Sequence, residues 1–266
     1  MISDERRKKI LELLEQQHYM SVEKLARAIF VSEPTIRRDL AQLSKEGSLK
    51  RTRGGASFVN PDTVDWPFSF RKKENIDEKR KIAQLAIKLI HDGDSVFLDS
   101  GSTCFCLARE MVELKHLSVL TYGVDNAKIL AANDTINSQI TCGSYQLQRT
   151  SIYGFGTVDY IRKFHAKYAF ISSPGFHPEK GIFNYDHNEA ELKTAFYENA
   201  DYTIVLLDHK KIGKSFPYLE LANDHIDVII TDRPFEKHIQ DLCDVHNIKV
   251  IHTLEQMRSY ILEKGL

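Results

Sequence analysis

From Asp77 onward, short apolar runs alternate with amphipathic segments, and this alternation restricts the fold more than any other feature of the sequence. The apolar runs have the length of strands and contain few polar residues, which is typical of strands covered on both faces. We predict strands at 95–98, 117–121, 139–142, 167–172, 203–207, 227–230 and 248–251. We predict helices at 78–91, 124–132, 188–199, 235–246 and 254–263, with a further helix that ends at Met111. Such an alternation predicts a mostly parallel α/β sheet.

The N-terminal part of the chain differs in charge from the rest. The chain has 266 residues, enough for one large domain or two smaller ones. Residues 1–57 contain 12 Lys and Arg against 8 Asp and Glu, a balance of +4, whereas the remainder contains 24 against 29, a balance of −5. A basic head on an acidic body fits a nucleic-acid-binding module joined to a second domain. We predict domains at 1–57 and 76–266, joined by a linker at 58–75 in which prolines interrupt any periodicity.

Three observations bear on the compartment and on cofactors. No apolar run is close to the roughly 18 residues that a membrane helix needs. Charged residues stand near the N-terminus where a signal peptide would be apolar. The four cysteines form no C-x-x-C pair, which argues against a zinc ribbon or a disulfide framework. We therefore expect a cytoplasmic protein that contacts no membrane and holds no metal or organic cofactor.

The N-terminal domain is predicted to form three short helices and a hairpin. On the third helix, Ile36, Leu40 and Leu43 share one face, and polar side chains occupy the opposite face. Arginine and glutamine can make paired hydrogen bonds to base edges, and hydroxyl groups at a helix start can bind phosphate. The candidate DNA-binding residues are Ser32, Thr35, Arg37, Arg38 and Gln42 at or on this helix and Lys50, Arg51 and Arg53 on the hairpin.

An ordinary three-helix bundle with a solvated basic face would share several of these features. However, the run VSEPTIRRDLAQLSKEGSLKRTRGGA, from Val31 to Ala56, resembles the winged helix-turn-helix of the DeoR family of bacterial transcriptional regulators. The TIRRDL core and the terminal GGA carry this resemblance. The resemblance implies that residues 20–39 form the helix-turn-helix and that its second helix enters the major groove of operator DNA.

A second candidate site follows the predicted strand at 95–98. There the sequence Asp99-Ser100-Gly101-Ser102-Thr103 leads directly into a helix. Ligands of open α/β sheets bind at the carboxyl ends of strands. A glycine lets the backbone approach a ligand, and the N–H groups of a helix start favour an anion. The segment is thus a candidate phosphate site, although a tight turn with a helix cap would have a similar sequence.

Other predicted strand ends and one helix add candidate effector-binding residues. The strand ends contribute Tyr122, Gly123, Gly143, Gly175, Asp208 and Lys211. Glu189 and Lys193 lie four residues apart on a predicted helix and therefore share one face. An ordinary surface ion pair would have the same spacing.

These segments resemble the effector domain of the DeoR family, whose fold resembles ribose-5-phosphate isomerase and whose members sense phosphorylated sugars or related intermediates. The resemblance implies a Rossmann-like α/β domain. It implies that the phosphate end of the effector is lined by Asp99, Gly101, Ser102 and Thr103. It implies that the sugar end is faced by Glu189, Lys193, Asp208 and Lys211. Tyr122 departs from the family, which often has asparagine at this position.

The sequence therefore predicts a transcriptional regulator, most simply a repressor of a sugar catabolic operon, that a phosphorylated sugar controls and that is not an enzyme. One alternative is a sugar-phosphate isomerase-like enzyme with a DNA-binding head. The residues that could transfer protons in such an enzyme are Asp99, Glu189, Asp208 and Lys211. Another is a nucleic-acid-binding scaffold without a ligand. The expected partners are double-stranded operator DNA, the effector and further copies of the chain. We expect a dimer or tetramer, because one head buries too little surface for tight specific binding.

Overall fold

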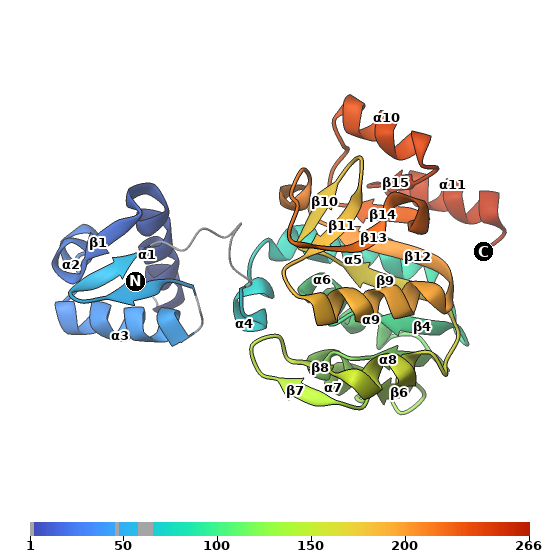
Figure 1. Cartoon of the computed structure of the whole chain (residues 1–266), viewed down its shortest axis with the longest axis horizontal. Helices are drawn as coiled ribbons and strands as arrows, with labels where there is room; N and C mark the ends of the chain where they lie inside the picture. Colours follow the sequence, from blue (N-terminus) through green and yellow to red (C-terminus); the bar gives the residue numbers. More distant parts are fainter. Residues whose placement is uncertain (1–2, 46–47, 58–65) are drawn as a thin grey trace. The chain divides into compact units, whose positions relative to one another are not determined.

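The computed structural model describes residues 3–45, 48–57 and 66–266 (Figure 1). The chain divides into two compact units, Met1–Lys73 and Glu74–Leu266. The predicted linker at 58–75 lies partly outside the described residues. Its described part contains a short helix, α4 (Phe68–Arg71). The division between the units, after Lys73, falls within the predicted linker.

Before α4, the described part of the first unit contains three helices and a small antiparallel sheet (Figure 1). The helices are α1 (Ser3–Gln17), α2 (Val22–Ile29) and α3 (Glu33–Lys45). The strands are β1 (Tyr19–Ser21), β2 (Lys50–Thr52) and β3 (Gly55–Ser57), in the order β1-β3-β2. The apolar face predicted for the third helix is buried in the core of this unit. The structure confirms the helices and the hairpin, and it adds β1, which is too short to show a strand periodicity in the sequence.

The second unit is built around a seven-stranded sheet in which every pairing is parallel. Its strands are β4 (Ser95–Leu98), β5 (Ser118–Thr121), β6 (Asn137–Ile140), β9 (Ala166–Ser172), β12 (Ala200–Leu207), β14 (Val228–Thr231) and β15 (Lys249–Ile251). Their order is β15-β14-β12-β9-β4-β5-β6. The chain thus builds outward from β4 to one edge and then returns to β9 to build toward the other. This reversal makes the β4–β9 seam the topological switch point of the sheet.

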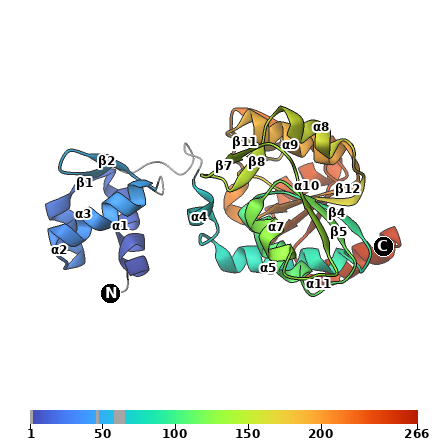
Figure 2. The ribbon, with the colours of Figure 1, turned by 90° about the horizontal axis from the view of Figure 1, so that it is seen from below.

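Helices cover both faces of this sheet (Figure 2). They are α5 (Ile76–Ala86), α6 (Ser102–Met111), α7 (Val124–Leu130), α8 (Phe155–Ile161), α9 (His187–Glu198), α10 (Lys237–Val245) and α11 (Leu254–Lys264). In β12, Ile204 and Leu206 pack in one core with α5, α6 and α11, whereas Val205 and Leu207 pack in the other with α8, α9 and α10. Burial on both faces explains why the sheet strands read as continuous apolar runs.

Short elements complete the second unit. The 3-10 helices are η2 (Ile87–Leu89), η3 (His209–Lys211) and η4 (Asn223–His225). A separate antiparallel sheet has the order β10 (Gly175–His177), β11 (Gly181–Asn184) and β13 (Tyr218–Ala222). A hairpin joins β7 (Ser144–Gln146) to β8 (Ser151–Tyr153). Within the described ranges, no helix is both long and apolar enough to cross a membrane.

The structure differs from the sequence prediction within the large sheet, at its edge and outside it. The strand predicted at 203–207 is β12, which begins three residues earlier, at Ala200. The strand predicted at 139–142 is β6, which begins two residues earlier, at Asn137. The sequence did not predict α8 or the five strands of the small sheet and the hairpin. The small-sheet and hairpin strands have three to five residues each, too few to show a clear periodicity.

Candidate nucleic-acid interface and effector site

The turn between α2 and α3 is defined by local hydrogen bonds and backbone conformation. Ser21 begins α2, because its Oγ accepts a hydrogen bond from the Lys24 N–H at 3.2 Å. Phe30 ends α2 in the left-handed conformation, with φ of 59°. The Ser32 carbonyl then accepts hydrogen bonds from the N–H groups of Thr35 and Ile36, which opens α3. This helix–turn–helix geometry is what a groove-reading α3 requires.

The predicted DNA-binding residues lie at the start of α3, on its outer face and on the hairpin. Arg37, Arg38 and Gln42 are exposed on the helix, and Lys50, Arg51 and Arg53 are exposed on or just after β2. The Ser32 and Thr35 hydroxyl oxygens lie 2.9 Å apart. Arg37 Nη2 lies 2.9 Å from Glu33 Oε2, so this arginine has an intrahelical partner.

An ion pair between α1 and α3 was not predicted from the sequence. Asp39 is buried, and its two carboxylate oxygens accept from Arg6 Nε at 2.5 Å and from Arg6 Nη2 at 3.1 Å. The acidic residue of the TIRRDL motif therefore fixes the position of α3 from inside the unit. The TIRRDL motif includes Asp39, but its partner Arg6 is distant in the sequence, so the motif alone did not predict the pair.

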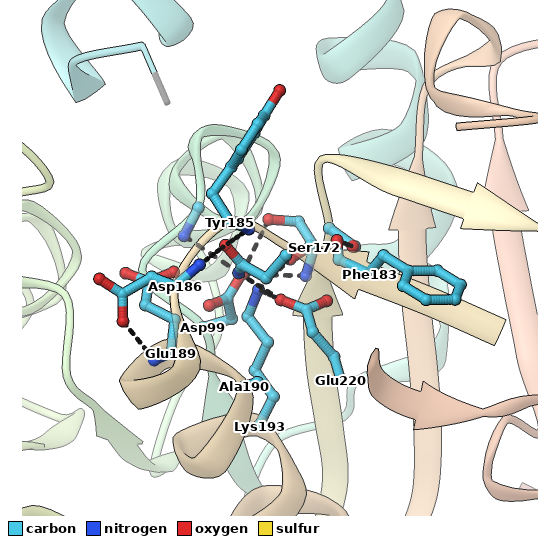
Figure 3. Close-up of polar contacts among 12 residues, drawn as sticks. Asp99, Ser172, Phe183, Tyr185, Asp186, Glu189, Ala190, Lys193 and Glu220 are labelled. Atoms are coloured by element: carbon cyan, nitrogen blue, oxygen red, sulfur yellow. Dashed lines mark hydrogen bonds and ion pairs between the residues drawn. The ribbon is translucent and has the colours of Figure 1, made fainter. Parts of the chain in front are cut away.

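In the second unit, charged and polar residues gather at the carboxyl ends of β4 and β9 (Figure 3). Asp99 follows β4 and is buried. Its Oδ2 accepts hydrogen bonds from the Ser172 N–H at 2.9 Å, the Ser172 hydroxyl at 2.8 Å and the Gly101 N–H at 3.2 Å. The Tyr122 hydroxyl, at the end of β5, donates to Asp99 Oδ1. Asp99 thus joins the ends of three strands.

Burial alone would raise the pKa of Asp99, but the charge of Lys193 and the hydrogen bonds from Tyr122 and Ser172 outweigh burial and lower it. The carboxyl group is therefore ionised. The pKa of Tyr122 is raised well above its ordinary value, first by burial and then by the neighbouring carboxylates. Tyr122 is thus a neutral hydrogen-bond donor to a buried anion.

Lys193 projects from α9 into the same cluster, as Figure 3 shows. Its Nζ donates to the Ser172 carbonyl at 2.8 Å and pairs with Glu220 Oε1, which also accepts from the Asn184 side chain. All of these side chains are buried. Burial would lower the pKa of Lys193, but Asp99, Glu220 and Glu189 raise it above the ordinary value. Lys193 is a buried cation among carboxylates.

Glu189 and Lys193 share one face of α9 as predicted, but the interpretation as a surface ion pair is wrong. Both are buried, and each pairs with another element. Glu189 Oε2 lies 3.0 Å from Arg149 Nη1, and Asp186 Oδ2 lies 3.8 Å from Arg149 Nη2. Arg149, from the β7–β8 loop, is itself buried. The sequence prediction missed Arg149, Glu220 and Ser172, because only the tertiary fold brings them to α9 and β4.

Asp208 and Lys211 form a second cluster, at the end of the neighbouring strand β12. Asp208 is buried, and its Oδ2 lies 3.6 Å from Lys211 Nζ. Its Oδ1 accepts from the Lys210 N–H at 3.2 Å, which caps η3. Among the described residues, no hydrogen bond or ion pair joins Asp208 or Lys211 to Asp99, although β12 and β9 are adjacent.

The predicted glycines have different surroundings. A Cβ added to Gly101 would lie 1.8 Å from Ser172 Oγ, so this position is closed by the protein itself. Gly123 immediately precedes α7, and its added Cβ would lie 2.9 Å from Ser100 Cα. Gly175 lies on β10. Gly143 has φ of +145°, and a Cβ added to it would lie 2.5 Å from Thr157 Oγ1 and from the Tyr153 carbonyl oxygen.

Ser102 and Thr103 occupy the first turn of α6, a helix of ten residues. Both are buried, and Thr103 Oγ1 has no hydrogen-bond partner in the described part of the chain. The first N–H groups of a helix also lack intrahelical acceptors. This helix start therefore presents donors at the switch point of the sheet.

A basic winged helix-turn-helix unit, joined to a parallel α/β unit with a charged cluster at its switch point, defines the class of ligand-responsive transcriptional regulators. A family model described as the DeoR-like helix-turn-helix domain matches residues 6–62, and one described as the DeoR C terminal sensor domain matches residues 74–233. The chain belongs to the DeoR family of transcriptional regulators.

The relatives agree with this assignment. The chain is 32% identical over 237 residues to the HTH-type transcriptional regulator GolR of Listeria innocua, covering 89% of this chain and 93% of that protein. It is 27% identical over 250 residues to the glycerol-3-phosphate regulon repressor of Escherichia coli, covering 94% and 99%. A solved ribose 5-phosphate isomerase of Methanocaldococcus jannaschii is 18% identical, with a TM-score of 0.38, over 52% of this chain and 55% of that chain. The chain is thus a DNA-binding transcriptional regulator of the DeoR family, which confirms the predicted class of protein.

Proposed function

We propose that a phosphorylated sugar binds at the β4–β9 seam and controls the binding of operator DNA by α3. The single observation that carries this proposal is the Thr103 hydroxyl, which is buried without a hydrogen-bond partner at the start of α6. A buried polar group of this kind is costly unless a partner satisfies it. A phosphate oxygen at the helix start would supply that partner.

The surrounding residues suit a sugar phosphate in particular. Ser102 and Thr103 would bind the phosphate, while Asp99 holds the loop through its bonds to Gly101 and Ser172. Glu189 and Lys193, with Arg149, would bind hydroxyl groups, because paired carboxylates and cations offer both acceptors and donors. In this proposal, Asp208 and Lys211 face the end of the sugar opposite the phosphate. The site is shaped by Tyr122, Gly123 and Gly175. The relative named for the glycerol-3-phosphate regulon is consistent with a small phosphorylated polyol.

Thr103→Val tests the phosphate site without loss of a protein hydrogen bond. Thr231→Val is the matched control, because Thr231 is equally buried and also lacks a partner in the described structure. We expect thermal shifts by a panel of sugar phosphates for the wild type and the control. For Thr103→Val we expect at least about tenfold weaker binding, since a hydrogen bond to a charged group contributes roughly 1.5–3 kcal/mol. Gly101→Val is a poorer test, because its side chain would collide with Ser172.

Unphosphorylated sugars and inorganic phosphate complete the panel. An equal thermal shift of Thr103→Val and wild type would place the phosphate elsewhere. A shift by unphosphorylated sugars alone, or by no sugar phosphate, would overturn the proposed effector class.

On the DNA side, we propose that Arg38 and Gln42 read base edges and that Ser32 and Thr35 contact phosphate. The basic hairpin residues would follow the DNA backbone. Because such heads bind paired half-sites, we propose that the repressor acts as a homo-oligomer, a dimer or tetramer, on operator DNA in the cytoplasm.

A further inference from the structure

A residue near the start of the second unit contacts the proposed effector site directly. Asn75 is the second residue of this unit and immediately precedes α5. Its backbone is left-handed, with φ of 48° and ψ of 43°, and its side chain makes no capping hydrogen bond to the helix. Asparagine at a helix start usually caps the helix. In this chain, the Asn75 side chain instead bonds to a different part of the unit.

The Asn75 side chain is bonded to the end of β12. Its Nδ2 donates to Asp208 Oδ1 at 3.4 Å, and its Oδ1 accepts from Lys210 Nζ at 2.7 Å. Asp208 is also the cap of η3 and the ion-pair partner of Lys211. One buried carboxylate therefore contacts the start of the unit, the η3 turn and a cation assigned to the effector.

Neighbouring hydrogen bonds hold the start of α5 in place. Lys79 Nζ donates to the Glu74 carbonyl at 2.6 Å, which ties the helix to the residue before Asn75. Lys81 Nζ donates to the Asp232 carbonyl, just beyond the end of β14. The first turns of α5 are thus attached to the carboxyl edge of the sheet at two adjacent strands.

We propose that Asn75 is a positioning residue that couples occupancy of the Asp208–Lys211 site to the segment leading to the DNA-binding unit. This inference rests on the proposed function. A ligand that engages Asp208 or Lys211 changes the partners available to Asn75, whose 3.4 Å bond to Asp208 is long for a hydrogen bond. A ligand alters DNA affinity only through contacts that differ between two states, and a change in the Asn75 contacts would supply such a difference.

Asn75→Gly removes both side-chain contacts and still permits the left-handed backbone. Asn247→Gly is the matched control, because Asn247 also has a left-handed backbone, with φ of 59°, and is exposed. The measurements are the operator Kd by fluorescence anisotropy, with and without a sugar phosphate that shifts the wild type, and the thermal shift by that ligand. Lys210→Met is a second variant, because it removes the contact between Lys210 and Asn75 by changing the lysine.

We expect Asn75→Gly and Lys210→Met to keep the wild-type operator Kd without ligand and to keep the thermal shift. The ratio of operator Kd with and without ligand should fall at least about fivefold toward one, the lower end of common coupling factors. Asn247→Gly should keep the wild-type ratio. A merely structural role for Asn75 would move the melting temperature and leave this ratio unchanged.

Two results would overturn the inference while the proposed function stands. One is a wild-type ratio in Asn75→Gly, and the other is loss of the thermal shift itself, which would make Asn75 part of the binding site. If no sugar phosphate alters operator binding by the wild type, the proposed function fails and this inference fails with it.

Discussion

Arg38 is the residue on which the proposed reading of operator DNA depends most directly. It is exposed on α3, whereas its neighbour Arg37 pairs with Glu33. We expect Arg38→Ala to weaken operator binding by about 1–3 kcal/mol if the side chain contacts a base. Fluorescence anisotropy measures this change. Arg258→Ala, an equal charge change at an exposed position of α11, should have little effect. Equal affinities of both variants would exclude Arg38 from the interface.

Tyr122 is the residue that connects stability to pH. Because the folded-state pKa of Asp99 is lowered, Asp99 stabilises the fold above its ordinary pKa, and this contribution is lost as the pH falls through the folded-state value. Tyr122→Phe removes the hydrogen bond to Asp99 and so raises that pKa. We expect a loss of about 2 kcal/mol at pH 7 and acid unfolding that begins at a higher pH.

Urea unfolding between pH 3 and pH 7 measures this effect. Tyr260→Phe is the control, because the Tyr260 hydroxyl is buried and has no hydrogen-bond partner among the described residues. If the free energy of unfolding of Tyr122→Phe falls with decreasing pH over the same range as that of the wild type, Tyr122 does not support the Asp99 carboxylate.

At the scale of elements, the position of α3 depends on α1 through the Arg6–Asp39 pair. Arg6→Ala leaves a buried carboxylate without its guanidinium partner and should destabilise the first unit by about 2 kcal/mol. Hydrogen exchange of the α3 amides in the full chain measures this loss. Arg27→Ala removes an exposed pair with Glu23 and should change exchange by less than about 1 kcal/mol. Similar exchange in the two variants would contradict a special role for Arg6.

The elements that could be predicted from the sequence are those with enough residues to show a periodicity. The strand at 95–98 was predicted with its observed bounds, because it is apolar and central. β6, at the edge, begins with Asn137, Ser138 and Gln139, so its apolar signal is weak and the prediction was displaced. The helix at 188–199 was predicted to within one residue of α9 at each end.

The candidate site was predictable only in part, and for a related reason. Residues at strand ends, such as Asp99 and Asp208, follow from the position of the strands. Arg149 lies on a loop and Glu220 on the short strand β13, and the role of both depends on burial that the sequence does not show. The same burial turns Glu189 and Lys193 from an apparent surface pair into two separate buried ion pairs.

At the scale of the whole molecule, the oligomeric state decides how tightly the operator is held. The chain has a mass of 30.6 kDa. We expect light scattering at micromolar concentration to give a multiple of this mass. An operator with two half-sites spaced by about one helical turn should bind more tightly than one with a single half-site. A mass of one chain in the presence of operator DNA would refute the predicted dimer or tetramer.

The strand order has a consequence for biosynthesis. β4 pairs with β5 on one side, but its other neighbour is β9, where Val96 lies opposite Tyr168. A ribosome must therefore complete the first half of the sheet, and all the chain up to β9, while one edge of β4 is still open. Unpaired strand edges of this kind are prone to aggregation. Asp99 receives its Ser172 donors only when that edge closes, so the polar cluster at the β4–β9 seam cannot form on a nascent half of the sheet.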